Sequence, residues 1–299
     1  MGDDNFDIVG IGASTIDTFY LVDEFPGEEG VYESDQSVVS GGGPVATALA
    51  AASALGSRTA MFDRIGDDWR GDRILSEFKN FGVDVSGIIK EAGAESSGAT
   101  ALVRRRDGAR AITFTRATCR ELNTDEVNAE YIAGAKILHL NGRHHEASMY
   151  ACEVARDLGV KISFDGGANR FRESSRDYVR RSDICIVALD FAMNYTAIAQ
   201  DIDAMAEAIF AEGVAELVAI TDGTNGSWVF RSSGEKFHQP AIAADKVIDT
   251  TGCGDVYHGA FLHHYAQGAS PEHAALEASK WASKTCEGLG GRSALTRSS

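Results

Sequence analysis

The amino-acid sequence predicts a three-layer α/β/α domain with a mostly parallel central sheet and a small separate β-sheet lid. Short apolar runs alternate with helical patterns through the middle of the chain, which is typical of parallel strands joined by crossover helices. Two other segments show the polar–apolar alternation of antiparallel hairpins. The length of 299 residues is enough for a full core without disulfides or metals.

The alternation of strands and helices is clearest between residues 137 and 221. The expected elements, in order, are strand 137–140, helix 147–158 with Gly159 at its end, strand 160–164, helix 174–181, strand 184–187, helix 202–211 and strand 217–221. Crossover helices cover both faces of such a sheet, and this gives three layers. Ligands of open parallel sheets bind beyond the carboxyl ends of the strands, so we expect the site at that edge.

Residues 18–40 and 97–115 do not follow this alternation. The second segment contains Asp107-Gly108 between two alternating runs, which is a strong signal for a β-hairpin. The first segment has similar runs on either side of Pro26-Gly27. We therefore expect four antiparallel strands that form a discontinuous lid. The α/β domain is then expected to comprise residues 1–17, 41–96 and 116–299.

The charge and composition exclude several classes of partner. The sequence has 28 Lys and Arg against 44 Asp and Glu, a net charge of −16. Nucleic acids and anionic membranes bind basic surfaces, so neither is expected as a partner. No apolar stretch is long enough to span a membrane, and the acidic first residues do not resemble a signal peptide. The five cysteines match no metal-binding spacing and indicate reduced thiols, so a cytoplasmic protein is expected.

The most informative segment is Asp249–Asp255, with the sequence DTTGCGD. It leads into an expected helix over residues 256–267 that ends at Gly268. Glycines at the N-terminus of a helix leave backbone N–H groups open to an anion, and the helix dipole favours negative charge there. Asp255 by itself could be an ordinary helix-capping residue. Beside an anion site, its carboxylate also suits a general base that deprotonates an attacking hydroxyl.

A second glycine-rich segment, Ser40–Pro44, precedes an alanine-rich helix over residues 45–55. Pro44 fits the first position of that helix, and Gly56 fits the position after its end. One interpretation is a flexible turn before a closely packed helix. The other is that the three glycines let backbone amides approach a ligand with many hydroxyl groups.

In this order and at these separations, the motifs resemble the ribokinase/PfkB family of carbohydrate kinases over nearly the whole chain. Ile65–Gly71, with the sequence IGDDWRG, belongs to the same resemblance. Within the family, Asn141–His144 (NGRH) and Gly290–Arg292 (GGR) are most similar to the ketohexokinase and sulfofructose kinase branch. The resemblance implies a ribokinase-like fold and ATP-dependent, Mg²⁺-dependent phosphorylation of a sugar hydroxyl. The expected substrate is a ketohexose or a related sugar, which could be anionic. The protein is also expected to form a homodimer through the lid.

The resemblance also implies roles for individual residues. Asp255 matches the catalytic base, and Gly252, Cys253 and Gly254 match the anion hole around the γ-phosphate. The positions expected to bind the sugar are Asp17, Gly42, Gly43, Thr47 and Arg143. The positions expected to bind the nucleotide are Thr221, Gly223, Gly226 and Ser279. Asp249 and Thr251 match a loop that binds a monovalent cation, which is K⁺ in many members.

Several positions depart from the family pattern. Thr47 stands where the family usually has Asn. The Asn-x-x-Glu motif that organises Mg²⁺ is missing after the strand at 184–187, where only Asp190 offers a carboxylate. Val31 replaces a Lys of the sulfofructose kinases, which weakens the case for a sulfosugar. The planar fork of Arg143 still suits an anionic group on the substrate.

Cys253 is a further departure, because the family usually has Ala at this position. A thiol among the N–H groups of a helix N-terminus is expected to have a lowered pKa and to react readily. The alternative is that Cys253 points into the core behind the helix as a small apolar filler.

Two functions other than a sugar kinase stay open. The first is a nucleoside kinase, because the same fold can accept different substrates. The second is a catalytically silent protein that binds a sugar or a nucleotide, which the missing Asn-x-x-Glu motif would explain. The intact Asp255 disfavours the silent protein.

Other signals in the sequence are weaker. Gly10–Ser14 follows a strand, but it lacks the third glycine and the acidic residue of a dinucleotide site. The histidines at 144–145 and within 258–264 lack the helical spacing and third partner of zinc ligands. Arg104–Arg106 fits the solvated edge of a lid better than a phosphate clamp.

Overall fold

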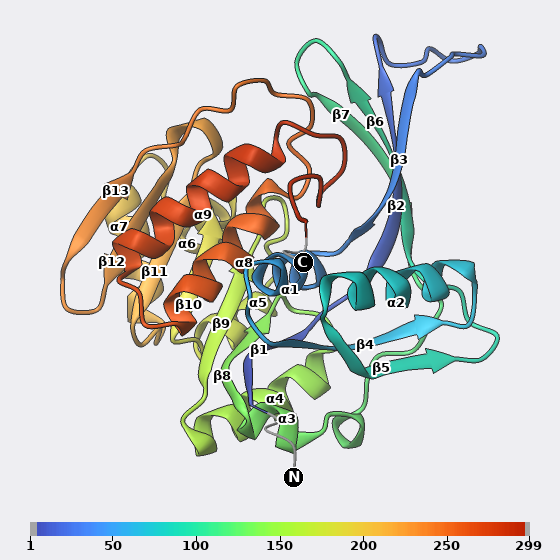
Figure 1. The fold of residues 1–299 in the computed structure, drawn as a ribbon. Coiled ribbons are helices and arrows are strands. Elements are labelled where there is room, and N and C mark those ends of the chain that lie inside the picture. The colour runs from blue at the N-terminus through green and yellow to red at the C-terminus, as the bar shows by residue number, and fades with distance from the viewer. Residues whose placement is uncertain (1–4, 297–299) are drawn as a thin grey trace.

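Strands of two sheets form the frame of the structure, which is a computed structural model that describes residues 5–296 (Figure 1). The strands of the larger sheet are β1 (Phe6–Ile11), β4 (Thr59–Gly66), β5 (Asp84–Glu91), β8 (Ala135–Leu140), β9 (Lys161–Gly166), β10 (Ile184–Ala188), β11 (Leu217–Thr221), β12 (Ser227–Arg231) and β13 (Lys236–Gln239). Their order across the sheet is β13-β12-β11-β10-β9-β8-β1-β4-β5. Neighbours from β11 to β5 pair in parallel, and β12 and β13 pair antiparallel at one edge. The predicted mostly parallel sheet is confirmed.

Helices cover both faces of this sheet (Figure 1). They are α1 (Pro44–Ala54), α2 (Trp69–Phe81), α3 (Ala129–Ala133), α4 (His145–Leu158), α5 (Ser175–Val179), α6 (Leu189–Thr196), α7 (Ile202–Ala211), α8 (Cys253–Ala266) and α9 (Pro271–Thr285). Leu49 of α1 and Phe261 of α8 belong to one buried cluster, whereas Cys152 of α4 and Met205 of α7 belong to another. The predicted three layers are therefore confirmed. No helix within residues 5–296 is long and apolar enough to cross a membrane.

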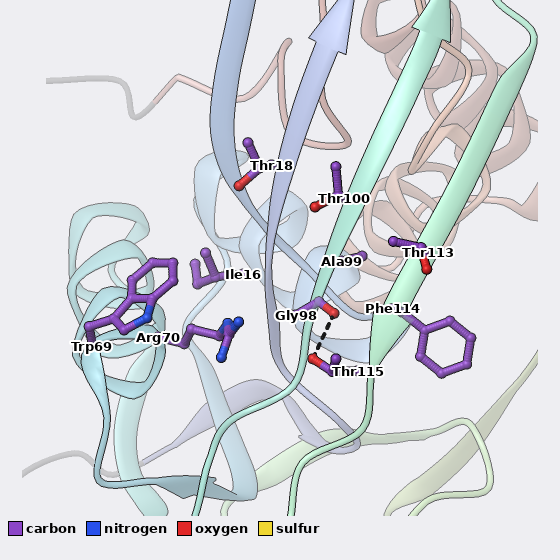
Figure 2. Close-up of a pocket in the computed structure, with 10 residues that line it drawn as sticks. All are labelled: Ile16, Thr18, Trp69, Arg70, Gly98, Ala99, Thr100, Thr113, Phe114 and Thr115. Atoms are coloured by element: carbon purple, nitrogen blue, oxygen red, sulfur yellow. Dashed lines mark hydrogen bonds between the residues drawn. The ribbon is translucent and has the colours of Figure 1, made fainter. Parts of the chain in front are cut away.

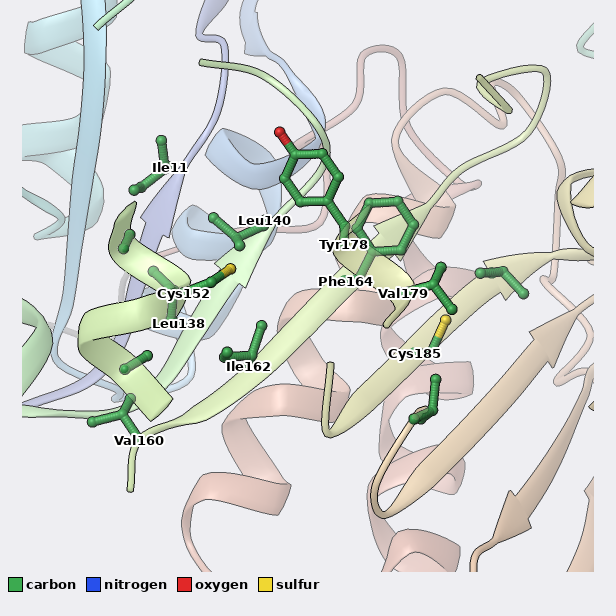
Figure 3. Close-up of a cluster of buried hydrophobic side chains, with 14 of the residues drawn as sticks. Ile11, Leu138, Leu140, Cys152, Val160, Ile162, Phe164, Tyr178, Val179 and Cys185 are labelled. Atoms are coloured by element: carbon green, nitrogen blue, oxygen red, sulfur yellow. The ribbon is translucent and has the colours of Figure 1, made fainter. Parts of the chain in front are cut away.

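Strand β10 shows how one sheet supplies two cores. Ile184 and Ile186 face the cluster under α1 and α8, while Cys185 and Val187 face the cluster under α4 and α7. Figure 3 shows part of the second cluster, in which Cys185 lies near large side chains such as Phe164. Because side chains alternate between the two faces, a strand buried on both sides must be apolar at every position.

The elements predicted between residues 137 and 221 are present, and α6 is an additional helix there. Helix α6 directly follows β10, and its N-cap residue, Ala188, offers no side-chain hydrogen bond. Without a polar capping residue, the only sequence signal at the start of this helix is Asp190 in its first turn, so tertiary contacts help to establish it.

The smaller sheet is the predicted lid. Its strands are β2 (Thr15–Val22), β3 (Gln36–Gly42), β6 (Gly98–Arg104) and β7 (Arg110–Thr115), in the order β3-β2-β6-β7. The hairpin predicted at Asp107-Gly108 joins β6 and β7. The prediction that all four strands are antiparallel was wrong, because the central pair, β2 and β6, is parallel. These two strands leave the larger sheet after the parallel strands β1 and β5, so they enter the lid in the same direction.

The lid strands also extend into the segments next to the predicted lid. Strand β2 begins at Thr15, so Asp17 lies on it, and β3 runs through Gly42, with only Gly43 between it and α1. The division into residues 1–17, 41–96 and 116–299 against 18–40 and 97–115 stays a prediction. Residues 1–4 and 297–299 of that division lie outside the described part of the chain.

Helices α1 and α8 approach each other closely because small residues line their contact. A Cβ placed on Gly259 of α8 would lie 2.2 Å from the carbonyl oxygen of Ala48 and 2.8 Å from Cβ of Ala51. Both alanines are fully buried in α1. The alanine-rich sequence of α1 therefore serves close packing, and this packing holds the N-terminus of α8 in place.

We expect Gly259→Ala to lower the free energy of unfolding by about 1–3 kcal/mol, because the added methyl group overpacks the α1–α8 contact. Gly254→Ala is the matched control on the same helix, since a Cβ there would meet nothing within 4 Å. Its free energy of unfolding should stay equal or rise, as expected for replacing glycine in a helix. Urea unfolding followed by circular dichroism measures both. Equal destabilisation of the two variants would contradict the packing argument.

Candidate active site

The N-terminus of α8 has the geometry expected for an anion site. Gly252, its N-cap residue, has a φ of 74°, and a Cβ on it would lie 2.4 Å from the carbonyl oxygen of Gly291. Only glycine fits this conformation without strain. No side chain caps the helix, and its first bond of the helical type runs from Val256 N–H to the Gly252 carbonyl oxygen. The N–H groups of Cys253 and Gly254 precede that bond and are thus among those that an α-helix leaves without a helical partner.

Asp255 lies in the first turn of this helix, as predicted. Its side chain keeps 20% exposure, and Nη1 of Arg170 lies 3.8 Å from its Oδ1. Burial raises the pKa of Asp255, the Arg170 guanidinium opposes this shift, and the nearby Asp165 adds to it. A carboxylate with a raised pKa is a stronger base, provided that a cation keeps it ionised.

Asp165 and Arg170 are site residues that the sequence analysis missed. Asp165, on β9, is 2% exposed, and its Oδ2 lies 3.7 Å from Nη1 of Arg170. Arg170 therefore lies between two carboxylates, those of Asp165 and Asp255. One sequence signal could have found this pair: Asp165 is a charged residue near the carboxyl end of a strand that is otherwise apolar and buried.

Two buried histidines complete the surroundings of Asp165. Nε2 of His258 lies 3.6 Å from Asp165 Oδ1, and Nδ1 of His139 lies 3.2 Å from Ser163 Oγ. Burial lowers the pKa of His139 to about 3 and that of His258 to about 4, so both imidazoles are neutral at pH 7. One ligand atom from each of His139, Asp165 and His258 lies within 4.8 Å of the others, which is a donor set that could hold a divalent cation. The guanidinium of Arg170 already partners the carboxylate of this set.

The sequence analysis discounted His258 as a metal ligand because no suitable second ligand lies near it along its helix. In the structure, the two residues that could share a metal ion with it are His139 on β8 and Asp165 on β9. His263 is an ordinary polar histidine, since its Nδ1 lies 2.8 Å from Ser57 Oγ.

The sugar side of the predicted site gathers around Asp17. A Cβ on Gly42 would lie 2.2 Å from Asp17 Oδ2, so a side chain at position 42 would displace the carboxylate. Gly43 has a φ of 93°, and a Cβ there would lie 2.0 Å from the carbonyl oxygen of Ala13. Within residues 5–296, Asp17 Oδ1 is buried and has no hydrogen-bond partner. This oxygen is therefore available to accept a hydrogen bond from a sugar hydroxyl.

Arg292 joins the C-terminal segment to this glycine-rich segment, and the sequence analysis assigned it no role. Its side chain is 4% exposed, and Nη1 lies 3.1 Å from Oε2 of Glu77. Nη2 donates to the carbonyl oxygen of Gly42 at 3.3 Å, and Nε donates to Thr47 Oγ1 at 3.3 Å. The hydroxyl of Thr47 thus holds Arg292. Its predicted contact with the sugar stays a prediction.

Arg143 follows β8, and its Nη1 lies 3.1 Å from Oε1 of Glu121. Its side chain is 41% exposed, so the pair faces solvent. An anionic group on a substrate must share Arg143 with this carboxylate. The neighbouring Asn141 has a buried Oδ1 that no described residue bonds. That oxygen would lie 3.3 Å from a Cβ on Gly12, so Asn141 lines the same region as α1.

The predicted nucleotide residues lie on two elements. Thr221 ends β11 and is followed by a short 3₁₀ helix, Gly223–Asn225, and by Gly226. Gly226 has a φ of 89°, and a Cβ on it would lie 2.1 Å from the Gln239 carbonyl oxygen, so glycine is required there. Ser279 lies on α9 and is 7% exposed.

The predicted cation loop is organised by Asp249, whose side chain is fully buried. Its Oδ1 accepts hydrogen bonds from the backbone N–H and the hydroxyl of Thr251, at 2.8 and 2.7 Å. Its Oδ2 accepts a hydrogen bond from Gly290 N–H at 2.9 Å. Nη1 of Arg110, from the lid, donates to Thr251 Oγ1 at 3.2 Å. Asp249 therefore connects the loop before α8 to the segment that carries Arg292.

The prediction of a lowered pKa for Cys253 was wrong. Its Sγ lies 3.0 Å from Sγ of Cys286, and this contact together with burial raises the pKa of the Cys253 thiol. The helix N-terminus favours a thiolate, but this effect is outweighed. The neighbouring thiol and the low polarity around Cys253 both disfavour the charged thiolate form. Cys286 shows the opposite direction, since its contact with Cys253 lowers its pKa.

This geometry brings together a parallel α/β sheet, an uncapped helix N-terminus with glycines and an acidic residue in its first turn. The fold and site define a ribokinase-like phosphotransferase. The model of the pfkB family carbohydrate kinases matches residues 5–297. The chain belongs to this family and is a sugar kinase of it.

Individual relatives agree with the family. Probable fructokinase-2 of Arabidopsis thaliana is 30% identical over 265 residues, which cover 81% of this chain and 78% of the relative. Among solved structures, the adenosine kinase of Sinorhizobium meliloti has a TM-score of 0.85 at 23% identity, with 98% and 97% of the two chains covered. The ribokinase of Arabidopsis thaliana, complexed with ribose and ATP, has a TM-score of 0.80 at 20% identity, with 95% and 93% covered. These two structures support the fold.

We expect Arg292→Met to lower the free energy of unfolding by about 3–5 kcal/mol, because it removes the buried counter-charge of Glu77 and leaves only the exposed Arg73 near that carboxylate. Arg73→Met is the matched control. Arg73 also pairs with Glu77, at 3.8 Å, but its side chain is 48% exposed, so its loss should cost less than about 1 kcal/mol. Urea unfolding measures both variants. A similar loss for the two would show that burial of the Arg292 pair is not what matters.

Proposed function

We propose that this protein transfers the γ-phosphoryl group of ATP to a hydroxyl of a sugar, with Asp255 as the general base. The observation that carries the proposal is the position of Asp255 in the first turn of α8, beside backbone N–H groups that no side chain caps. The sugar side and the phosphate side are also close in space. The charge of Arg292 acts on the pKa of Asp17 and on that of Asp255, so both carboxylates lie within its field.

The residues divide the work as follows. Asp17 and the backbone of Gly42 and Gly43 hold the sugar hydroxyls. Asp255 accepts the proton of the attacking hydroxyl, and the N–H groups at the start of α8 stabilise the charge on the transferring group. Arg170, which lies 3.8 Å from Asp255, supplies a further positive charge on the same side.

Mg²⁺ would be held mostly by the phosphates of ATP, where it neutralises their charge. Asp190, in the first turn of α6, is the only carboxylate predicted where the Asn-x-x-Glu motif is missing. Its oxygen atoms are the type of ligand that Mg²⁺ prefers. Its Oδ2 accepts a hydrogen bond from Asn169 N–H at 2.6 Å. Asn169 directly precedes Arg170, so Asp190 also orders the segment that carries the guanidinium.

A ketohexose or a related sugar is the proposed substrate. The similarity to a probable fructokinase supports this class. An anionic sugar would have to compete with Glu121 for Arg143, which favours neutral sugars. A nucleoside kinase is the second candidate, and the structural similarity to an adenosine kinase favours it.

The lid is also proposed to form a homodimer. On β7 every residue is exposed, including Ile112 at 53% and Phe114 at 62%. Phe114 lines a pocket of about 150 Å³ with Thr18 and with Trp69, which is itself 60% exposed (Figure 2). Phe114 pairs with Ala99 and Ala99 pairs with Asp17, so Phe114 lies on the face of the lid that carries Asp17, whereas Thr18 lies on the other face. Apolar surface of this kind is typical of an interface.

A cytoplasmic location stays a prediction.

We expect Asp255→Asn to lower kcat by about 100- to 10,000-fold while ATP still binds, because the amide keeps the shape but cannot accept the proton. ADP release measures this over ketoses, aldoses, sugar acids, sulfosugars and nucleosides, and calorimetry measures ATP binding. Asp203→Asn is the matched control, since Asp203 lies in the first turn of α7 and is exposed. More than half of the parent activity in Asp255→Asn would refute the assignment. ADP release with nucleosides alone would identify the second candidate.

Because Asp249 and Thr251 match a monovalent-cation loop, we expect K⁺ to raise kcat relative to Na⁺ at constant ionic strength. The physical reason is that a cation of the right size would fix the loop that leads into the N-terminus of α8. Steady-state rates in Li⁺, Na⁺ and K⁺ measure the effect. Equal rates in all three would show that the buried hydrogen bonds of Asp249 hold the loop without a cation.

A further inference from the structure

Two cysteines meet at the N-terminus of α8. Cys253 is the first residue of that helix, and Cys286 directly follows the last residue of α9. Their Sγ atoms lie 3.0 Å apart, and both residues are partly exposed. Cys152 and Cys185, by contrast, are buried in the core, and Cys119 is partly exposed on another part of the chain. The pair therefore joins two helices at the predicted anion hole.

We propose that Cys253 and Cys286 form a reversible disulfide, and that this bond reduces phosphoryl transfer by displacing the backbone at the anion hole. The regulatory part of this proposal rests on the proposed kinase function. The formation of the bond does not depend on it.

The geometry needs little change for the bond to form. A disulfide has an S–S distance of about 2.05 Å, so the two sulfurs must approach each other by roughly 1 Å. Helices α8 and α9 already pack side by side (Figure 1). Partial exposure lets a small oxidant reach the pair, whereas the thiols of Cys152 and Cys185 are shielded. The same two sulfurs are therefore the preferred site of cross-linking in this chain.

Hydrogen peroxide is a sufficient oxidant. One thiol of the pair loses its proton, and the thiolate attacks a peroxide oxygen. The O–O bond breaks to give a sulfenic acid and hydroxide, and the hydroxide takes up that proton to form water. The second thiol then attacks the sulfenic sulfur, the S–O bond breaks, and a second water leaves as the disulfide forms. Overall, two thiols lose two protons and two electrons, and one peroxide is reduced to two waters.

The backbone around the pair explains why the bond should affect the reaction. Cys253 contributes an N–H group to the predicted anion hole, and Asp255 is two residues further along the same turn. The carbonyl oxygen of Cys286 accepts hydrogen bonds from the N–H groups of Ile248 and Asp249, at 2.7 and 3.2 Å. A displacement of either cysteine would therefore also displace the loop before α8 and the first turn of α8. A misplacement of about 1 Å at a reacting centre can cost roughly 100-fold in rate.

The test compares the parent chain, Cys286→Ser and Cys119→Ser, each reduced or treated with hydrogen peroxide. Non-reducing peptide mapping by mass spectrometry locates the cross-link. ADP release measures phosphoryl transfer, and calorimetry measures the affinity for ATP. Cys286→Ser should keep the basal activity, because the residue itself contacts neither sugar nor phosphate in the proposed mechanism. Cys119→Ser is the matched control for the loss of a partly exposed thiol.

We expect a linked peptide pair containing Cys253 and Cys286 in the parent chain and in Cys119→Ser, with ADP release reduced at least tenfold and restored by dithiothreitol. Cys286→Ser should keep its rate after peroxide. Absence of the linked peptides, an unchanged rate in the linked protein, or equal inactivation of Cys286→Ser would each overturn the proposal. If the reduced parent releases no ADP with any sugar or nucleoside, the kinase function fails instead. The linked protein is then judged by its ATP affinity, which should fall at least threefold.

Discussion

The buried guanidinium of Arg292 is the interaction on which the rest of the site depends. A charge with 4% exposure requires partners, and Arg292 finds them in Glu77, in the Gly42 carbonyl oxygen and in the hydroxyl of Thr47. Glu77 Oε2 in turn accepts a hydrogen bond from Gly41 N–H at 2.6 Å. The C-terminal segment, α2 and the glycine-rich segment before α1 are thereby fixed to one another. The two carboxylates of the proposed mechanism lie within the field of this one cation.

Close backbone approach is the second constraint, and it explains why glycines occur where they do. Gly252 packs against Gly291, one residue before Arg292, and Gly259 packs against the carbonyl oxygen of Ala48. These contacts place the N-terminus of α8 between the C-terminal segment and α1. A side chain at either glycine would move the helix, and the proposed anion site would move with it. The packing of small residues therefore also sets the position of the turn that carries Asp255.

Local groups at the proposed site have to overcome the negative charge of the whole chain. A net charge of −16 repels ATP at long range, so the phosphates must be held by local groups. In the proposed mechanism, these groups are the N–H groups at the start of α8 and the guanidinium of Arg170. The carboxylate of Asp165 helps to position Arg170, and the two neutral histidines beside Asp165 add no charge.

The sequence by itself determined the layers of the fold, the hairpin at Asp107-Gly108 and the glycine-rich start of α8, because these depend on residues near one another in the chain. The sequence could not determine that β2 and β6 pair in parallel, that Asp165 partners His258, or that Cys253 faces Cys286. Those contacts join residues far apart in sequence, and no local periodicity or spacing records them. Tertiary packing decided them, because the way in which the helices and strands pack against one another sets which buried groups come into contact.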